Sequence, residues 1–133
     1  MLTHYPVFGV GVNTYCANYP TYKLYEPPGA ETASNMYAHN SFLQMACETG
    51  LVGLAIFLWF LFRLFKQGRR AYMSISDNYL KITCLCAAAC LIGFLINGMT
   101  ETSLYYGRVV MIFWLIAGVL LSMNKFADGA RPS

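Results

Sequence analysis

Charged residues are scarce in this chain. Its 133 residues include nine basic and six acidic side chains, whereas 57% of the residues are apolar. The few charges gather in short clusters instead of spreading evenly, as they do on soluble domains. The net charge of +3 is small and gives no support for nucleic-acid binding. The composition therefore indicates a membrane protein and argues against a nucleic-acid partner.

Three long stretches nearly lack charge, namely residues 49–65, 82–99 and 104–123. The first contains only Arg63, the second contains no charge and the third contains only Arg108. At about 1.5 Å per helical residue, each spans roughly 25 to 30 Å, close to the thickness of the hydrocarbon core of a bilayer. A very apolar soluble bundle is the alternative, but its helices seldom run this long without a polar face. We predict an all-α membrane protein with three transmembrane helices after an irregular or short-helical extracytoplasmic segment.

The basic residues predict the orientation of the chain, because cytoplasmic connections are enriched in lysine and arginine. They cluster around the first connection and after the third stretch: Arg63, Lys66, Arg69, Arg70, Lys81, Lys125 and Arg131. We therefore divide the chain into an extracytoplasmic segment (1–48), a three-helix transmembrane region (49–125) and a cytoplasmic tail (126–133). The protein is predicted to be a multi-pass protein of the bacterial cytoplasmic membrane.

The first 48 residues contain no charged start followed by an apolar run that would serve as a signal peptide. We therefore expect that an upstream segment carries them across the membrane. The chain is expected to be part of a longer polytopic protein, in which Met1 need not be the natural start.

The extracytoplasmic segment carries the residues that are candidates for catalysis or binding. His39 can exchange a proton near neutral pH and lies just before the first apolar stretch. Asn40 or Ser41 is expected to cap a helix there, with Gln44 answering Ser41 as in a capping box. Glu48 follows two turns later. Two glycines, Gly9 and Gly11, permit unusual backbone angles or close approaches and are interpreted as structural.

The cysteines do not indicate a metal site. Cys84 and Cys86 are two residues apart on a predicted helix and point to nearly opposite sides. Cys16 and Cys47 lie outside and could form a disulfide only if the fold brings them together. We predict no metal and no other cofactor.

One face of the second stretch carries small residues at intervals of four, three and four. Such residues permit a neighbouring membrane helix to approach closely, and an asparagine adds a hydrogen bond. The residues are Cys86, Cys90, Gly93 and Asn97. We interpret this face as a helix-packing surface.

The order of three motifs resembles the O-antigen ligase and polymerase family of bacterial envelope proteins. These motifs are residues 6–11 (PVFGVG), 38–44 (AHNSFLQ) and 48–54 (ETGLVGL). The resemblance covers roughly the first half of the chain. It implies a multispanning glycosyltransferase that acts at the outer face of the cytoplasmic membrane on polyprenyl-diphosphate-linked oligosaccharides. The chain would be its carboxyl-terminal part, and most of the family's arginines would lie upstream, so we expect the chain to be inactive alone.

The resemblance also implies roles for individual residues. His39 matches the histidine of the family and would act as a base or orient the acceptor hydroxyl, which is a poor nucleophile at neutral pH. Asn40 and Arg108 would contact the substrate, because a departing diphosphate needs compensation of its charge. Arg108 has a second interpretation as an ordinary interfacial anchor. Glu48 would orient the helix and His39, and Gly9 and Gly11 would be structural.

A different class of function stays open. The chain could be a small, non-catalytic helical subunit or scaffold in envelope polysaccharide assembly. The partners expected are membrane lipid, the lipid-linked oligosaccharide, and either a missing amino-terminal transmembrane part or partner subunits.

Overall fold

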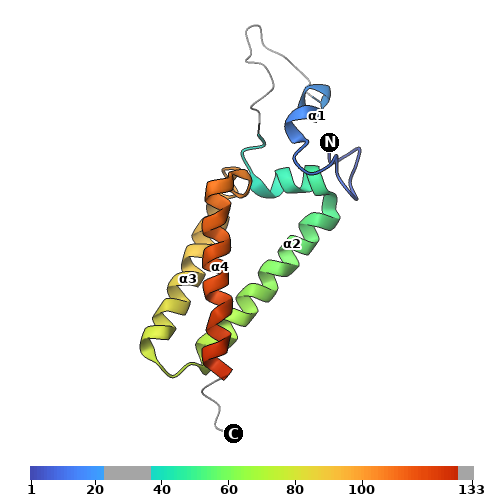
Figure 1. Ribbon diagram of the computed structural model, residues 1–133. Helices are drawn as coiled ribbons and strands as arrows, with labels where there is room; N and C mark the ends of the chain where they lie inside the picture. Colours follow the sequence, from blue (N-terminus) through green and yellow to red (C-terminus); the bar gives the residue numbers. More distant parts are fainter. Residues whose placement is uncertain (23–36, 129–133) are drawn as a thin grey trace. The chain divides into compact units, whose positions relative to one another are not determined.

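The computed structural model describes residues 1–22 and 37–128, and all regular secondary structure there is helical (Figure 1). The elements are α1 (Tyr15–Tyr22), α2 (Ser41–Ser74), α3 (Asn78–Asn97), a 3-10 turn η2 (Ser103–Tyr105) and α4 (Gly107–Asp128). α2, α3 and α4 are each long and apolar enough to cross a membrane. The predicted all-α fold with three membrane-spanning helices is thus confirmed. Part of the segment 1–48 and residues 129–133 of the tail lie outside the described residues.

α2 extends beyond both ends of the apolar stretch 49–65 that predicted it. α2 starts at Ser41 and continues past four basic residues to Ser74. Lysine and arginine are good helix formers, so a helix need not end where its hydrophobic run ends. The predicted division at residues 48 and 125 concerned sides of the membrane, and it stays a prediction.

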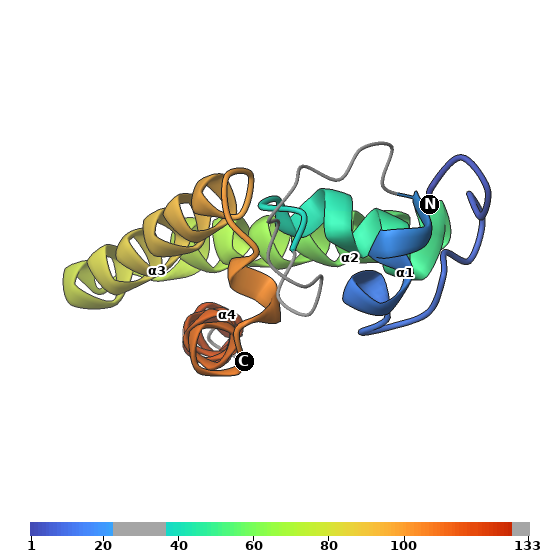
Figure 2. The same cartoon turned by 90° about the horizontal axis from the view of Figure 1, so that it is seen from above.

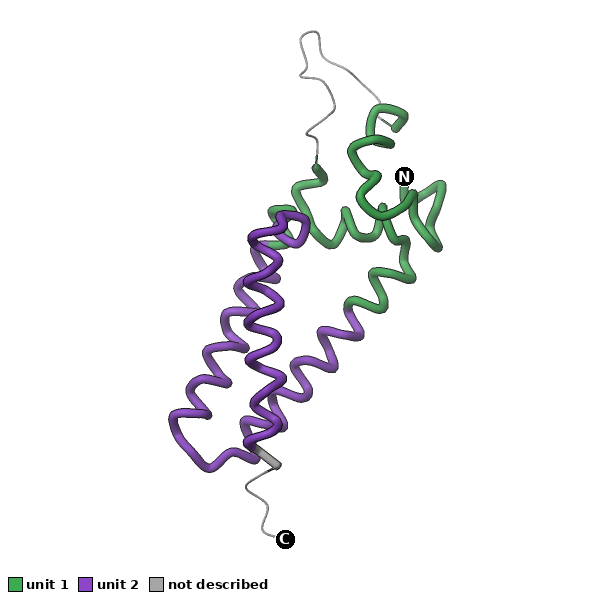
Figure 3. Tube along the Cα trace, viewed as in Figure 1, with its two compact units in different colours: residues 1–57, 98–102 green, residues 58–97, 103–133 purple. Residues whose placement is uncertain are grey.

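The chain forms two compact units (Figure 3). Unit 1 contains residues 1–57 and 98–102, and unit 2 contains residues 58–97 and 103–133. α1 and the first turns of α2 therefore belong to unit 1, whereas α3, η2 and α4 belong to unit 2.

In unit 1, α2 is interrupted at Gly50, whose backbone angles (φ 69°, ψ −174°) are not helical. Figure 1 shows the bend at this point of α2. Residues 6–11, which we call the strap, bond to both sides of the break. Val10 and Gly11 donate N–H groups to the carbonyls of Cys47 and Glu48, both at 2.9 Å. The strap thereby satisfies carbonyl groups that the broken helix leaves open.

On the other side of the break, the helix donates the hydrogen bonds and the strap accepts them. The N–H groups of Leu51 and Val52 donate to the carbonyls of Pro6 (2.8 Å) and Val7 (3.4 Å). The close approach needs a glycine in the strap, because a Cβ on Gly9 would lie 2.4 Å from the carbonyl carbon of Glu48. The interpretation of Gly9 as structural therefore has a physical basis in this structure.

In unit 2, α3 packs against α4 at an inclination (Figures 1 and 2). The Phe94 and Phe113 rings lie 5.3 Å apart between centroids, and Phe113 is fully buried. Gly68 of α2 lies against α4, since a Cβ there would meet the Leu120 side chain at 2.8 Å. The Cys84 thiol of α3 donates to the Gly68 carbonyl at 3.4 Å, so three helices meet near Gly68.

No helix of the described residues covers the small-residue face of α3, so its interpretation as a packing surface stays a prediction. Cys86 and Cys90 are exposed, and a Cβ on Gly93 would meet nothing within 4 Å. The buried residues of α3 are instead Cys84, Ala87 and Leu91. Spacing alone could not choose between the faces, because α3 is apolar all round.

Candidate functional site at the start of α2

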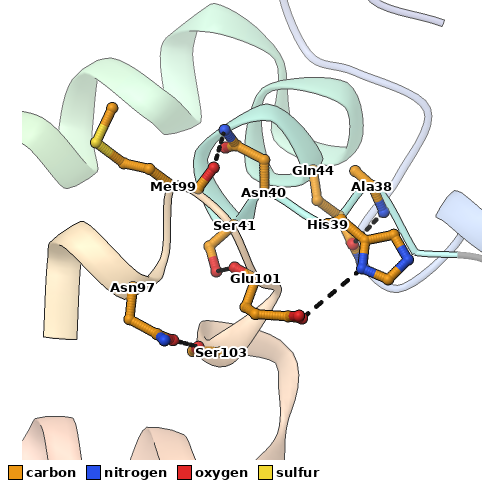
Figure 4. A network of polar contacts seen from close by, with 9 residues as sticks. All are labelled: Ala38, His39, Asn40, Ser41, Gln44, Asn97, Met99, Glu101 and Ser103. Carbon is orange, nitrogen blue, oxygen red and sulfur yellow. Dashed lines mark hydrogen bonds and ion pairs between the residues drawn. The ribbon is translucent and has the colours of Figure 1, made fainter.

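Asn40 caps α2. Its side-chain oxygen accepts the N–H of Leu43 at 2.9 Å, and its amide nitrogen donates to the Met99 carbonyl at 2.9 Å (Figure 4). The predicted helix start is therefore confirmed, with Asn40 as the capping residue. Gln44 does not complete a capping box with Ser41. Its side-chain oxygen accepts the N–H of Ala38 at 3.3 Å instead.

Ser41 joins the helix start to residues 98–102, which follow α3 in the chain. Its N–H donates to the Gly98 carbonyl at 2.8 Å, and its hydroxyl donates to the Glu101 carbonyl at 2.9 Å. Ser41 is completely buried. Asn40 and Ser41 together hold the turn at residues 98–102 against the start of α2.

His39 lies between two anchored neighbours. The N–H of Ala38 donates to the side chain of Gln44, and the side chain of Asn40 bonds to Leu43 and Met99. His39 itself has a left-handed backbone (φ 47°). Few residues other than glycine adopt such angles, although histidine is among those that do so more often. The hydrogen bonds of its neighbours therefore fix the backbone position from which the His39 side chain projects.

The His39 imidazole faces a carboxylate. Its Nδ1 lies 3.7 Å from a carboxylate oxygen of Glu101, and the side chains are 77% and 52% exposed (Figure 4). The two groups form an ion pair only when the imidazole is protonated, and the exposure weakens that pair. Among the described residues, Nε2 has no partner. Sequence reasoning missed Glu101, because 62 positions separate it from His39 and only the fold brings them together.

Glu48 does not lie beside His39 but at the start of α1. Its carboxylate accepts the N–H of Asn13 at 2.7 Å and that of Tyr15 at 3.2 Å, and it is 1% exposed. Gln44 donates a longer bond of 3.4 Å to the same group. A carboxylate suits this place, because the first N–H groups of a helix lack partners and carry partial positive charge. Glu48 thus positions the start of α1.

Tyr15 lies close to Glu48 and is half-buried. Burial raises the pKa of its hydroxyl above the ordinary value near 10, and Cys47, Tyr19 and Cys16 raise it further. Cys16 and Cys47 are free thiols in this structure, as are the other three cysteines.

The remaining predicted site residues are placed as follows. Gly11 belongs to the strap and donates its N–H to the Glu48 carbonyl. Arg108 is exposed at the second position of α4 and belongs to unit 2, whereas His39 belongs to unit 1. Within residues 1–22 and 37–128, no three histidine, cysteine or acidic side chains gather as a metal site would need.

The segment that carries His39 is similar to a known protein family. The described part of the chain is a helical membrane protein with a histidine at the start of a broken helix. Residues 1–58 match the family model described as O-antigen ligase, which confirms the family recognised from the sequence over this segment. The matched segment ends at residue 58, and the first stretch of unit 1 ends at residue 57. No curated protein and no solved structure matched the chain.

Proposed function

We propose that the chain supplies part of the active site of a membrane glycosyltransferase that moves polyprenyl-diphosphate-linked glycans at the outer face of the bacterial cytoplasmic membrane. The observation that carries this proposal is the placement of His39, on a strained backbone between two anchored residues, within the segment that matches O-antigen ligases. Strained backbone often marks functional positions.

In the proposed reaction, the acceptor hydroxyl gives its proton to Nε2 of His39 as its oxygen attacks the anomeric carbon. The bond between that carbon and the diphosphate oxygen breaks, and the diphosphate leaves with the electron pair. Glu101 holds the imidazole through Nδ1 and compensates the positive charge that forms on it, as acidic partners of catalytic histidines do. Asn40 keeps the helix start in place, and its bonds to Leu43 and Met99 leave its amide little freedom to bind substrate.

The proposal includes further membrane segments. His39 is 77% exposed and the described part of unit 1 carries neither arginine nor lysine, so these residues alone offer a diphosphate no permanently charged side chain. Arg108 is proposed to meet the diphosphate in the assembled protein, with interfacial anchoring as the competing role. The purified 133-residue chain, given a lipid-linked oligosaccharide and an acceptor, is expected to show no turnover.

The test is complementation of a bacterial strain that lacks the whole enzyme, with transferred glycan quantified from the envelope. His39→Ala in the complete protein is expected to lose roughly 10²-fold or more of the rate, the usual contribution of general acid–base catalysis. His39→Gln separates proton transfer from orientation, because an amide can orient a hydroxyl but cannot take its proton near neutral pH.

The chain offers a matched control, because His4 is its other histidine and is also exposed in unit 1. His4→Ala is expected to keep full activity. If a stably inserted His39→Ala protein transfers glycan at the normal rate, the catalytic role is refuted. A non-catalytic scaffold role for the chain would then be favoured.

A further inference from the structure

Unit 2 contains an apolar cavity of about 330 Å³ between α2, α3 and α4. Its apolar wall is formed by Phe65, Leu85, Ala88 and Leu120. Arg69 and Tyr72 also line it. The volume lies within the range of small-molecule sites, roughly 300 to 1,000 Å³. A cavity with one cation against apolar walls suits a ligand with an anionic head and an apolar chain.

The surroundings of this cavity are strongly basic. Arg69 also lines two adjoining hollows, one with Lys66 and one with Arg70. Tyr72 and Leu85 also line a third hollow, which contains Lys81. The apolar cavity therefore shares lining residues with hollows that carry three more basic side chains.

These positive charges are poorly compensated. Besides Arg108 and Arg131, unit 2 carries six lysine and arginine residues but only two acidic residues. The acidic residues are Asp77, whose carboxylate accepts the N–H of Leu80 at 2.9 Å, and Asp128, the last residue of α4. The side chains of Arg69, Arg70 and Lys81 make no hydrogen bond or ion pair with any of the described residues. Lys66 rests over the Phe62 ring at 5.7 Å. Guanidinium groups left without a carboxylate can receive a phosphate bidentately.

We propose that this cavity binds one anionic phospholipid from the leaflet at this end of the helices. An acyl chain lies along Phe65, Leu85, Ala88 and Leu120, and the phosphate is held by Arg69. Basic clusters at the ends of membrane helices attract anionic lipids at about 1 kcal/mol per residue. The apolar wall favours such a lipid over free phosphate, because phosphate has no apolar group to bury against it. The proposal is independent of the role of His39.

The purified 133-residue chain can be reconstituted in phosphatidylcholine bilayers that contain traces of spin-labelled lipid. Electron spin resonance then measures the fraction of labelled lipid that the protein immobilises. Spin-labelled phosphatidylglycerol is expected to be preferred over spin-labelled phosphatidylcholine by about fivefold, the value of one basic residue near an anionic lipid. Equal immobilisation of the two lipids would overturn the proposal.

Two pairs of variants locate the site. Arg69→Gln is expected to abolish most of the preference, whereas Lys125→Gln removes a basic residue outside the cavity and should keep it. Ala88→Trp fills the cavity and should also abolish the preference, whereas Ala89→Trp changes an exposed neighbour and should not.

Equal losses in Arg69→Gln and Lys125→Gln would show general surface attraction and refute a defined site. An unchanged preference in Ala88→Trp would refute seating of the chain in the cavity. Helix content by circular dichroism and monodisperse elution are required of each variant. Either pair decides the question alone if a member of the other fails to fold.

Discussion

Gly50 presents its bare Cα to the carbonyl oxygen of Val7, so closely that a Cβ on Gly50 would lie 2.1 Å from that oxygen. Its backbone angles also fall in a region that is essentially restricted to glycine. Two independent reasons therefore exclude a side chain at the break of α2.

Gly50→Ala is expected to lower the free energy of unfolding by about 2 kcal/mol or more, through backbone strain and the displaced strap. Thermal unfolding in detergent, followed by circular dichroism, measures the loss. Gly93→Ala is the matched control, because a Cβ there meets nothing within 4 Å and alanine favours a helix. Equal stability of the two variants would contradict the structure at Gly50.

Glu48→Ala is expected to free the start of α1, because the N–H groups of Asn13 and Tyr15 lose their acceptor. Leaving such groups unsatisfied costs roughly 1–3 kcal/mol. Hydrogen exchange at the Tyr15 amide should accelerate strongly in Glu48→Ala and less in Glu48→Gln, which keeps one acceptor oxygen. Glu101→Ala leaves the backbone bonds of Glu101 intact, and faster Tyr15 exchange there would argue against a specific role of Glu48.

Glu101→Gln is expected to lower the glycan-transfer rate at saturating acceptor without a matching change in KM. The reason is that the charge on the imidazole forms only during the reaction, so the carboxylate acts more strongly on the transition state than on bound substrate. The measurement requires the complete enzyme in membranes. An unchanged rate would leave His39 without an acidic partner in the mechanism.

Tyr15 makes stability sensitive to alkaline pH. Because burial raises its pKa in the folded state, the folded protein holds this proton more tightly than the unfolded chain does. Its contribution is complete below the unfolded pKa near 10 and is lost as the pH rises through the folded value. Unfolding experiments above pH 10 should show a smaller alkaline loss of stability in Tyr15→Phe than in the unaltered chain. An identical alkaline profile would refute this coupling.

The predicted orientation can be tested by chemical labelling. In a cysteine-free version, a single cysteine replaces either Thr21 or Ser74, both of which are exposed. An impermeant thiol reagent should label the Thr21 position in intact cells, and the Ser74 position only after lysis. The reverse pattern would show that the chain has the opposite orientation to the one that its basic residues predict.

The sequence predicts the features that depend on local composition. The three apolar stretches indicate the helices, and Asn40 marks the start of α2 within one residue. The break at Gly50 was not predictable, because nothing near Thr49 or Leu51 distinguishes a broken helix from a continuous one. The break depends on the strap, some forty residues earlier. For the same reason the partners of Glu48 and the approach of Glu101 to His39 could not be predicted, since each joins residues more than thirty positions apart.

The strap also bears on the length of the first membrane helix. An uninterrupted helix of the 34 residues of α2 would be about 50 Å long, far longer than a hydrocarbon core of about 30 Å. The break at Gly50 leaves residues 51–74, which form a helix of about 36 Å. The strap, by bonding to both sides of this break, thereby helps to match the apolar helix to the thickness of a bilayer.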